Sequence, residues 1–328
     1  MKSQKLVLSM LVVMTMTTGA AAQSGKVVRY APELDAIVPA EATIEKLAGG
    51  FGFTEGPIWL RAGFLLFTDY PEGIKKWTPA GSVMRYPEPD GAWKKGNESV
   101  PITKTNGLTL DRQGRLIICE QGKRRVARLE ADGTLTVLTE HYQGKLFNSP
   151  NDVVVKSDGS LYFTDPPYGL EKGDEDPSKE IPFNGVYRLA GGRVELIHRD
   201  LTRPNGLAFS PDEKYLYVAN SDAKRSLWMR FPVKPDATLG PGVVFYDVTG
   251  NKDEGLPDGM KVDRKGNVYG TGPGGVWVFS LLGKVLGIIK PPEVPANCNW
   301  GDADGKTLYL TARTGLYRIR LRVAGVRP

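Results

Sequence analysis

Short apolar stretches separated by turn residues follow one another along the whole chain. The segment that begins at Asn106 shows the pattern, because apolar and polar residues alternate over a few positions and clusters of Asp, Gln and Gly interrupt them. Such alternation, broken by turn formers, is typical of half-buried strands. It predicts strands over residues 108–110, 115–119, 125–129 and 134–138. The segment from Met260 to Ile289 repeats this arrangement of four short strands.

One short phrase opens each of these segments and recurs along the chain. Its copies are Thr54-Glu55-Gly56-Pro57-Ile58-Trp59, Thr105-Asn106-Gly107-Leu108-Thr109-Leu110, Pro150-Asn151-Asp152-Val153-Val154-Val155, Pro204-Asn205-Gly206-Leu207-Ala208-Phe209, Pro257-Asp258-Gly259-Met260-Lys261-Val262 and, more weakly, Ala296-Asn297-Cys298-Asn299-Trp300. Successive copies lie 39 to 54 residues apart, which is the period of propeller repeats.

Six copies of a four-stranded unit predict an all-β fold, a six-bladed β-propeller with four-stranded antiparallel blades around a central tunnel. One domain is expected to cover residues 23–328. The sixth unit has three clear strands and ends near Leu321, so its fourth strand is expected from Thr43–Leu47 at the other end of the chain. An irregular insertion, Pro166–Phe183, is expected to hang over one face of the disc.

The first 22 residues have the three parts of an export signal. Lys2 and Lys5 form a basic start, an apolar run extends from Leu6 to Met16, and small residues precede a cleavage site expected after Ala22. The run is shorter than the roughly 20 residues of a membrane-spanning helix, and no second run follows. We therefore expect a periplasmic or secreted protein with no transmembrane segment after removal of the signal.

Composition excludes several classes of protein. The 39 Gly, 24 Pro and 41% apolar residues indicate a globular chain rich in turns, not a disordered or all-helical one. A formal net charge of +6 is spread along the chain without a dense basic block, so nucleic acid is not expected as a partner. The two cysteines, Cys119 and Cys298, allow one disulfide at most, and their spacing does not decide whether it forms. We expect a monomer or a weak dimer.

One repeat position carries a side-chain oxygen in every copy of the phrase. Because innermost strands line the tunnel of a propeller, these residues are expected to form a ring. The ring consists of Glu55, Asn106, Asn151, Asn205, Asp258 and Asn297. Converging oxygens left dry and unpaired are costly, and a hard cation removes that cost. The alternative is that Asn-Gly and Asp-Gly recur as turn formers, which leaves Glu55 unexplained.

The oxygen ligands predict one divalent metal ion at the centre of the propeller. Ca²⁺ is expected first, with Mg²⁺, Mn²⁺ or Zn²⁺ as alternatives, and zinc with its usual thiolate and imidazole ligands is disfavoured. Other catalytic motifs are missing from the sequence, which has no G-x-S-x-G elbow, no Walker loop and no C-x-x-C. The two histidines, His141 and His198, lie outside the repeated phrase. Serine and zinc hydrolase mechanisms therefore have little support.

Several longer motifs occur in a characteristic order. They are Glu55-Gly56-Pro57, Asn148-Ser149-Pro150-Asn151-Asp152-Val153, Phe163-Thr164-Asp165-Pro166-Pro167-Tyr168-Gly169, Arg203-Pro204-Asn205-Gly206-Leu207 and Pro257-Asp258-Gly259-Met260. From about Glu55 to Leu321 the chain resembles the gluconolactonase, or senescence-marker-protein-30-like, family of six-bladed propellers. The resemblance implies a single divalent ion, commonly Ca²⁺, held by Glu55, Asn205 and Asp258. It implies Asn151 as a further metal or substrate contact.

The resemblance also implies a chemistry, the hydrolysis of sugar lactones such as gluconolactone. The related diisopropylfluorophosphatase type cleaves phosphorus–fluorine bonds with a similar set of Glu, Asn and Asp residues. Two positions depart from the family. Ser149 stands where animal lactonases carry an arginine that contacts substrate, and Gln121 stands where many bacterial relatives carry a histidine. Both departures bear on substrate preference and on any mechanism that needs that histidine.

The mechanism that we expect is metal-assisted attack of water on a lactone carbonyl. Asp258 and Asn151 are the predicted catalytic residues, with Asp258 as general base or Asp152 in its place. The predicted metal ligands are Glu55, Asn151, Asn205 and Asp258, and the predicted substrate contacts are Asn106, Asp152 and Asn297. Three alternatives stay open at this point: an esterase or phosphotriesterase with the same metal, a propeller that binds a sugar acid or partner without turnover, and a metal-free scaffold.

Overall fold

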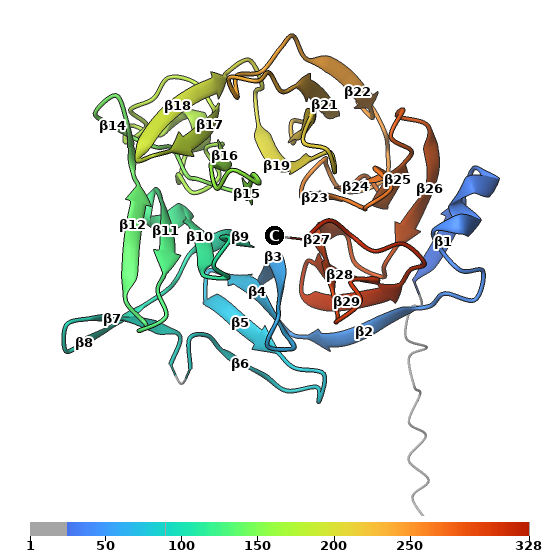
Figure 1. Ribbon diagram of the computed structural model, residues 1–328, viewed down its shortest axis with the longest axis horizontal. Helices are drawn as coiled ribbons and strands as arrows, with labels where there is room; N and C mark the ends of the chain where they lie inside the picture. Colours follow the sequence, from blue (N-terminus) through green and yellow to red (C-terminus); the bar gives the residue numbers. More distant parts are fainter. Residues whose placement is uncertain (1–24, 89, 328) are drawn as a thin grey trace, which may run out of the picture.

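Six antiparallel sheets surround a central axis in the computed structural model (Figure 1). The structure describes residues 25–88 and 90–327, so the expected export signal lies outside the described residues. The first strand of each sheet lies nearest the axis and contacts the first strands of the neighbouring sheets. The predicted six-bladed β-propeller is confirmed.

Each blade is built mainly from strands that follow one another in the chain. Blades 1 to 3 are β3 (Phe53–Leu60), β4 (Phe64–Tyr70), β5 (Gly73–Trp77) and β6 (Val83–Arg85); β9 (Thr105–Leu110), β10 (Leu116–Glu120), β11 (Arg125–Leu129) and β12 (Leu135–Thr139); and β15 (Val153–Val155), β16 (Leu161–Asp165), β17 (Gly185–Ala190) and β18 (Arg193–His198). Blades 4 to 6 are β19 (Pro204–Phe209), β20 (Tyr215–Asn220), β21 (Leu227–Pro232) and β22 (Val243–Asp247); β23 (Met260–Val262), β24 (Val268–Gly272), β25 (Gly275–Phe279) and β26 (Val285–Lys290); and β27 (Pro295–Gly301), β28 (Thr307–Ala312) and β29 (Gly315–Arg320).

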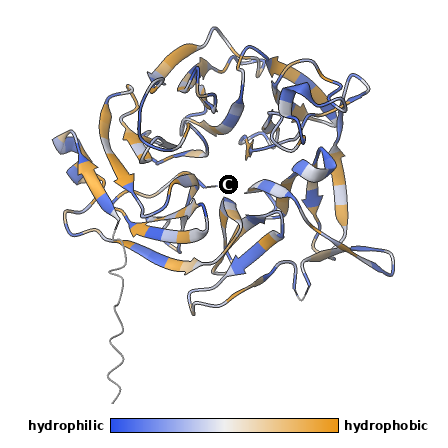
Figure 2. Cartoon of the chain, turned by 180° about the vertical axis from the view of Figure 1, so that it is seen from behind, coloured by the Kyte–Doolittle hydropathy of each residue, from blue (hydrophilic) through white to orange (hydrophobic). Residues whose placement is uncertain are grey.

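Apolar side chains fill the space between neighbouring blades. One buried cluster, for example, joins Ile58 and Leu66 of blade 1 to Leu108 and Ile118 of blade 2. Figure 2 shows apolar residues concentrated along the strands of the blades. Alternate residues of a strand point to opposite faces of its sheet, and each face of a blade is covered by a neighbour. Burial of apolar surface between blades is therefore the main force that assembles the disc.

The two ends of the chain complete the propeller. Strand β2 (Ile44–Gly49) pairs with β29 as the outer strand of blade 6, with Ile44 opposite Ile319, so the predicted closure is confirmed. Strand β1 (Lys26–Arg29) adds a fifth strand to blade 5 through β26, which the sequence did not predict. The C-terminal segment returns to the axis, where the amide of Val326 donates to the carbonyl of Val262 at 3.0 Å (Figure 1).

Several short elements decorate this frame. Two extra hairpins, β7 (Ala92–Lys95) with β8 (Glu98–Pro101) and β13 (His141–Tyr142) with β14 (Lys145–Leu146), follow blades 1 and 2. The 3₁₀ helices are η1 (Pro32–Ala36), η2 (Gln121–Lys123) and η3 (Gly173–Glu175), the last within the predicted insertion. Among the described residues, no helix combines the length and the apolar character needed to cross a membrane.

Candidate functional site

Each of the six ring residues lies either within an innermost strand or two residues before one. Four belong to strands β3, β9, β19 and β27, and Asn151 and Asp258 come two residues before β15 and β23. The pairing of β3, β9, β19 and β27 with their neighbours shifts register beside the ring residue. Such an irregularity re-aims a side chain out of the regular alternation. The structure thus brings the ring positions to the same layer of the tunnel wall.

Glycines after the ring residues allow neighbouring blades to approach closely. In four blades a Cβ atom at the next position would lie 2.0 to 2.6 Å from the nearest atom of the following blade's ring residue. These contacts pair Gly56 with Asn106, Gly107 with Asn151, Gly206 with Asp258 and Gly259 with Asn297. Of these glycines only Gly56 has a positive φ, of 48°. Close approach between blades, and not a turn, therefore explains the repeated glycine.

This packing makes a prediction for Gly206→Ala. Its Cβ would lie 2.3 Å from the backbone oxygen of Asp258, which cannot move without shifting the ring. We expect the variant to lose roughly 2–3 kcal/mol of unfolding free energy in urea denaturation of the metal-free protein. The matched control is Gly240→Ala, whose Cβ would be 3.4 Å from its nearest neighbour, Pro232. Equal stability of the two variants would contradict this role of the glycine.

Buried threonines hold the backbone of the ring, and the sequence analysis missed them. Thr68 Oγ1 donates to the carbonyl of Asn106 at 2.8 Å, across to the next blade. Thr271 does the same toward Ala296 at 2.8 Å. The signal was present in the sequence, because Phe67-Thr68-Asp69 and Phe163-Thr164-Asp165 repeat at the ends of second strands.

Asp165, which follows Thr164 in the second of these repeats, anchors the segment that leads to the ring. Asp165 is fully buried and accepts the backbone amides of Asn148 at 2.8 Å and Ser149 at 2.7 Å. Burial raises the pKa of Asp165 to about 7, although both amides act in the opposite direction. Glu120 instead pairs with Arg125 at 2.6 Å between Oε2 and Nε. Asp165 therefore positions the chain that carries Asn151, whereas the carboxylate of Glu120 forms an ion pair with Arg125.

Glu55 and Asn297 are joined directly. The Nδ2 of Asn297 donates to Oε2 of Glu55 at 3.0 Å, and the amide of Gly56 donates to the same oxygen at 3.0 Å. The Oδ1 of Asn297 accepts the amide of Cys298 at 2.9 Å, so both ends of this side chain are engaged. Asn297 thus positions Glu55, and its expected contact with substrate stays a prediction. Oε1 of Glu55 accepts no hydrogen bond from the residues that the structure describes.

Other ring oxygens are buried without a hydrogen-bond partner in the described part of the chain. They are Oδ1 of Asn106, Oδ1 of Asn151 and Oδ1 of Asp258. The ring residue Asn205 is buried as well, with 4% of its surface exposed. Buried oxygens without partners are rare in proteins because the lost hydration is not replaced. This set of carboxylate and amide oxygens has the chemistry that a hard divalent cation requires.

The two ring carboxylates strongly disfavour ionisation when no cation is bound. Burial and the charge of Asp152 raise the pKa of Glu55 to about 7. Burial, together with the charges of Glu55 and Asp152, raises the pKa of Asp258 well above its usual range. Within residues 25–88 and 90–327, no three His, Cys, Asp or Glu side chains come close enough to hold a metal alone. The candidate site is therefore mixed, with Glu55 and Asp258 supplemented by amide oxygens.

Asp152 lies in the tunnel but not among the candidate ligands. It occupies the position where four other blades have glycine, and it is 2% exposed. Its Oδ1 accepts the amide of Val153 at 2.9 Å, and its Oδ2 lies 3.9 Å from Nζ of Lys261. Asp152 is the ring neighbour whose charge acts on both Glu55 and Asp258.

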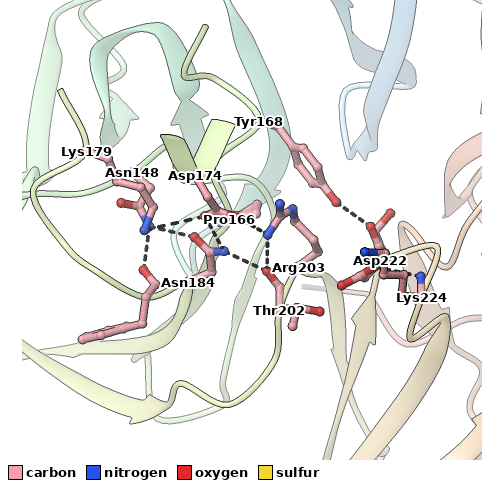
Figure 3. A network of polar contacts seen from close by, with 12 residues as sticks. Asn148, Pro166, Tyr168, Asp174, Lys179, Asn184, Thr202, Arg203, Asp222 and Lys224 are labelled. Atoms are coloured by element: carbon pink, nitrogen blue, oxygen red, sulfur yellow. Dashed lines mark hydrogen bonds and ion pairs between the residues drawn. The ribbon is translucent and has the colours of Figure 1, made fainter. Parts of the chain in front are cut away.

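The predicted insertion is fastened to the mouth of the tunnel by polar contacts (Figure 3). Asn184 accepts a hydrogen bond from Asn148 at 3.1 Å and donates to Asp174 at 3.1 Å, and Asp174 pairs with Arg203. The hydroxyl of Tyr168 donates to the carbonyl of Ser221 at 2.9 Å and so reaches blade 4. Burial raises the pKa of the Tyr168 hydroxyl, and the charges of Asp258 and Asp222 act in the same direction.

The two positions that depart from the family support this insertion. Ser149 is fully buried, its Oγ donates to the carbonyl of Pro166 at 2.6 Å, and it accepts the amide of Gly169 at 2.8 Å. Gln121 packs against the same Gly169 and has a buried Nε2 with no partner among the described residues. Ser149 thus ties down the insertion. Cys119 and Cys298, whose pairing the sequence left open, are both buried and free.

Comparison with known proteins agrees with this architecture. Residues 53–314 match the family described as SMP-30/Gluconolactonase/LRE-like region. The Gluconolactonase of Zymomonas mobilis is 37% identical over 319 residues, which cover 92% of this chain and 87% of that protein. The solved structure of a gluconolactonase from Xanthomonas campestris is 33% identical, with a TM-score of 0.78 over 92% of this chain and 96% of that one. A calcium-binding protein from Agrobacterium tumefaciens, regucalcin, shares the fold at 20% identity, with a TM-score of 0.67 over 86% of this chain and 94% of that one. The chain belongs to the SMP-30/gluconolactonase/LRE-like family.

Proposed function

We propose that this protein is a metal-dependent lactone hydrolase that opens sugar lactones of the aldonolactone type. The observation that carries the proposal is the ring of Glu55, Asp258 and four asparagines, in which several buried oxygens have no partner among the described residues. The relatives named gluconolactonase at 33% and 37% identity support the choice of substrate class. The leader at residues 1–22 supports action in the periplasm or outside the cell.

Four residues would hold the ion: Glu55, Asn151, Asn205 and Asp258. They offer oxygen ligands of the kind that Ca²⁺ accepts, and Mg²⁺ or Mn²⁺ are the closest alternatives. A bound divalent cation supplies Lewis acidity to a carbonyl oxygen and stabilises negative charge that develops on it. Asn297 contributes indirectly, because its amide fixes the orientation of the Glu55 carboxylate.

The side chains of the ring then divide the remaining work. Hydrolysis adds water to the lactone carbonyl, breaks the ring C–O bond and moves one proton from the water to the leaving hydroxyl. We assign the acceptance of that proton to Asp258, which with Glu55 supplies the two carboxylates of the ring. The amides of Asn106 and Asn151 are placed to orient water and substrate. We expect Tyr168 and the anchored insertion, which are held by Ser221 and Arg203, to border the entrance used by the sugar.

Removal of the metal tests this proposal. The mature protein, freed of divalent ions by chelation and dialysis, is expected to lose at least about a hundredfold in the rate of aldonolactone hydrolysis. Restoration of Ca²⁺ should return the activity, and a pH-indicator assay that records acid release measures both steps. The same assay with aryl esters and phosphotriesters as controls defines the substrate class.

The alternatives give different outcomes in the same experiment. Metal-dependent turnover of aryl esters or phosphotriesters, but not of lactones, would show that the substrate class is one of these esters and not a lactone. A protein that binds Ca²⁺ and a sugar acid but hydrolyses no substrate of the panel would be a binding propeller. Full lactone hydrolysis after complete removal of divalent ions would contradict the role of the ring as a metal site.

A further inference from the structure

Asp152 is a buried acid beside the candidate ligands that the ligand set does not use. Asp152 has an Oδ2 that is buried and accepts no hydrogen bond from any described residue. The carboxylates of Glu55, Asp152 and Asp258 nevertheless do not form a three-acid metal group. Asp152 therefore adds a negative charge to the surroundings of the proposed ion.

Lys261 is the cation that faces this acid. It belongs to the innermost strand β23, and its Nζ lies 3.9 Å from Oδ2 of Asp152 and donates to the carbonyl of Met260 at 2.9 Å. No other lysine or arginine of the described chain forms an ion pair with Asp152, Glu55 or Asp258. A buried charge is tolerated when it is paired. Within the described part of the chain, Lys261 is thus the one lysine or arginine paired with an acid of this group.

The side chain of Lys261 also has access to water. Its exposed fraction is 15%, and it lines a cavity of about 220 Å³ at the opposite end of the tunnel from the insertion. The cavity walls include Val153, Phe209 and Val262, and Val326 of the C-terminal segment. The side chain of Lys261 therefore reaches from Asp152 to this cavity.

We propose that Lys261 is a built-in counter-cation that sets the charge of the tunnel to suit a divalent ion. This inference rests on the proposed metal site. Three ionised carboxylates and one ammonium leave two negative charges, which a divalent cation neutralises. Without the ammonium three negative charges remain, and a trivalent cation becomes the better match. Lys261 acts through the charge of the site and not as a ligand, so it is a selectivity-determining residue.

Ion selectivity measures this role directly. The dissociation constants of Ca²⁺ and of terbium(III), a trivalent cation that also prefers oxygen ligands, would be measured by calorimetry for each purified protein. Lys261→Met should raise the preference for terbium(III) over Ca²⁺ by about tenfold or more, because the lost repulsion acts on one more unit of charge in the trivalent ion. Lys261→Arg keeps the charge and should keep the ratio. Lys265→Met, which removes an exposed lysine near the same strand, is the control for net charge.

A double variant keeps the test decisive if Lys261→Met does not fold. Lys261→Met combined with Asp152→Asn removes one charge of each sign and should retain the original ratio, while Asp152→Asn alone should shift it toward Ca²⁺. An unchanged ratio in Lys261→Met, or equal changes in Lys261→Met and Lys265→Met, would overturn the inference. If the double variant is the only one that folds, a shifted ratio there would overturn it as well. A parent protein that binds neither ion would instead contradict the proposed metal site itself.

Discussion

Glu55→Gln is expected to weaken Ca²⁺ binding by about a hundredfold or more and, at the same time, to stabilise the metal-free protein. The substitution keeps the size of the side chain and an oxygen that accepts from Asn297 and Gly56, so the packing is preserved. It removes one negative charge from the ligand set, which lowers affinity for the cation. Opposite effects on binding and on stability distinguish a metal ligand from a structural acid.

The gain in stability follows from the pKa of Glu55. Its folded value of about 7 lies above the ordinary value of 4.5, so the folded metal-free protein retains a proton that the unfolded chain releases. Below about pH 4.5 both states are protonated and no difference arises. Between about pH 4.5 and 7 the unfolding free energy of the parent falls as pH rises, and above pH 7 the loss is complete at roughly 3 kcal/mol. Glu55→Gln avoids this loss.

Urea denaturation of the metal-free proteins at pH 4.5 and at pH 8 tests this sign. The parent and Glu55→Gln should differ little at the lower pH, and the variant should be the more stable at the higher pH. Glu41→Gln, at an exposed position, is the matched control and should follow the parent at both values. A variant that is less stable than the parent at pH 8 would show that the carboxylate holds the fold together.

Much of the fold could be predicted because each blade repeats the same local signals. The strands expected over 108–138 agree with β9 to β12 to within a few residues, since apolar alternation and turn glycines mark both ends of each strand. Closure by β2 could be predicted because the sixth repeat contains only three strands, so that its outer strand had to come from the other end of the chain. The repeat supplies these elements independently of any long-range contact.

Elements outside the repeat could not be predicted in the same way. Strand β1 exists because β26 offers a free edge, and four residues of ordinary composition carry no signal of that edge. The C-terminal segment is placed by backbone hydrogen bonds such as that of Val326 to Val262, which any sequence could form. Availability of a partner, and not local propensity, decides both cases.

The candidate site, like the fold, could be predicted only as far as the repeat determines it. The ring positions could be predicted because the second residue of every copy of the phrase lies in an innermost strand or just before it. The sequence could not predict which of these oxygens lack a hydrogen-bond partner, because Asn297 and Asn106 are the same residue type at the same position of the repeat. Asn297 is engaged by Glu55 and Cys298, whereas Oδ1 of Asn106 has no partner in the described chain. Such a difference depends on neighbours from other blades.

Asp258→Asn is expected to reduce kcat for lactone hydrolysis by roughly a thousandfold, measured at saturating Ca²⁺. Asparagine keeps the size and one ligand oxygen, but it has no charge and does not accept a proton from water. Saturation with Ca²⁺ compensates for a loss of metal affinity alone, so the residual defect in kcat reports the role of Asp258 as general base. Recovery of most of the activity at high Ca²⁺ would contradict that role and leave Asp258 as a ligand only.

Asp152→Asn supplies the comparison that assigns the base. Its Oδ1 accepts the amide of Val153 and its Oδ2 lies 3.9 Å from Nζ of Lys261, whereas no lysine or arginine of the described chain forms an ion pair with Asp258. We therefore expect kcat to fall by less than about tenfold in Asp152→Asn, under the same Ca²⁺ saturation. A loss in Asp152→Asn as large as that in Asp258→Asn would transfer the role of base to Asp152. The larger effect at Asp258 is expected because, among the described residues, its carboxylate faces no cation of the kind that Lys261 presents to Asp152.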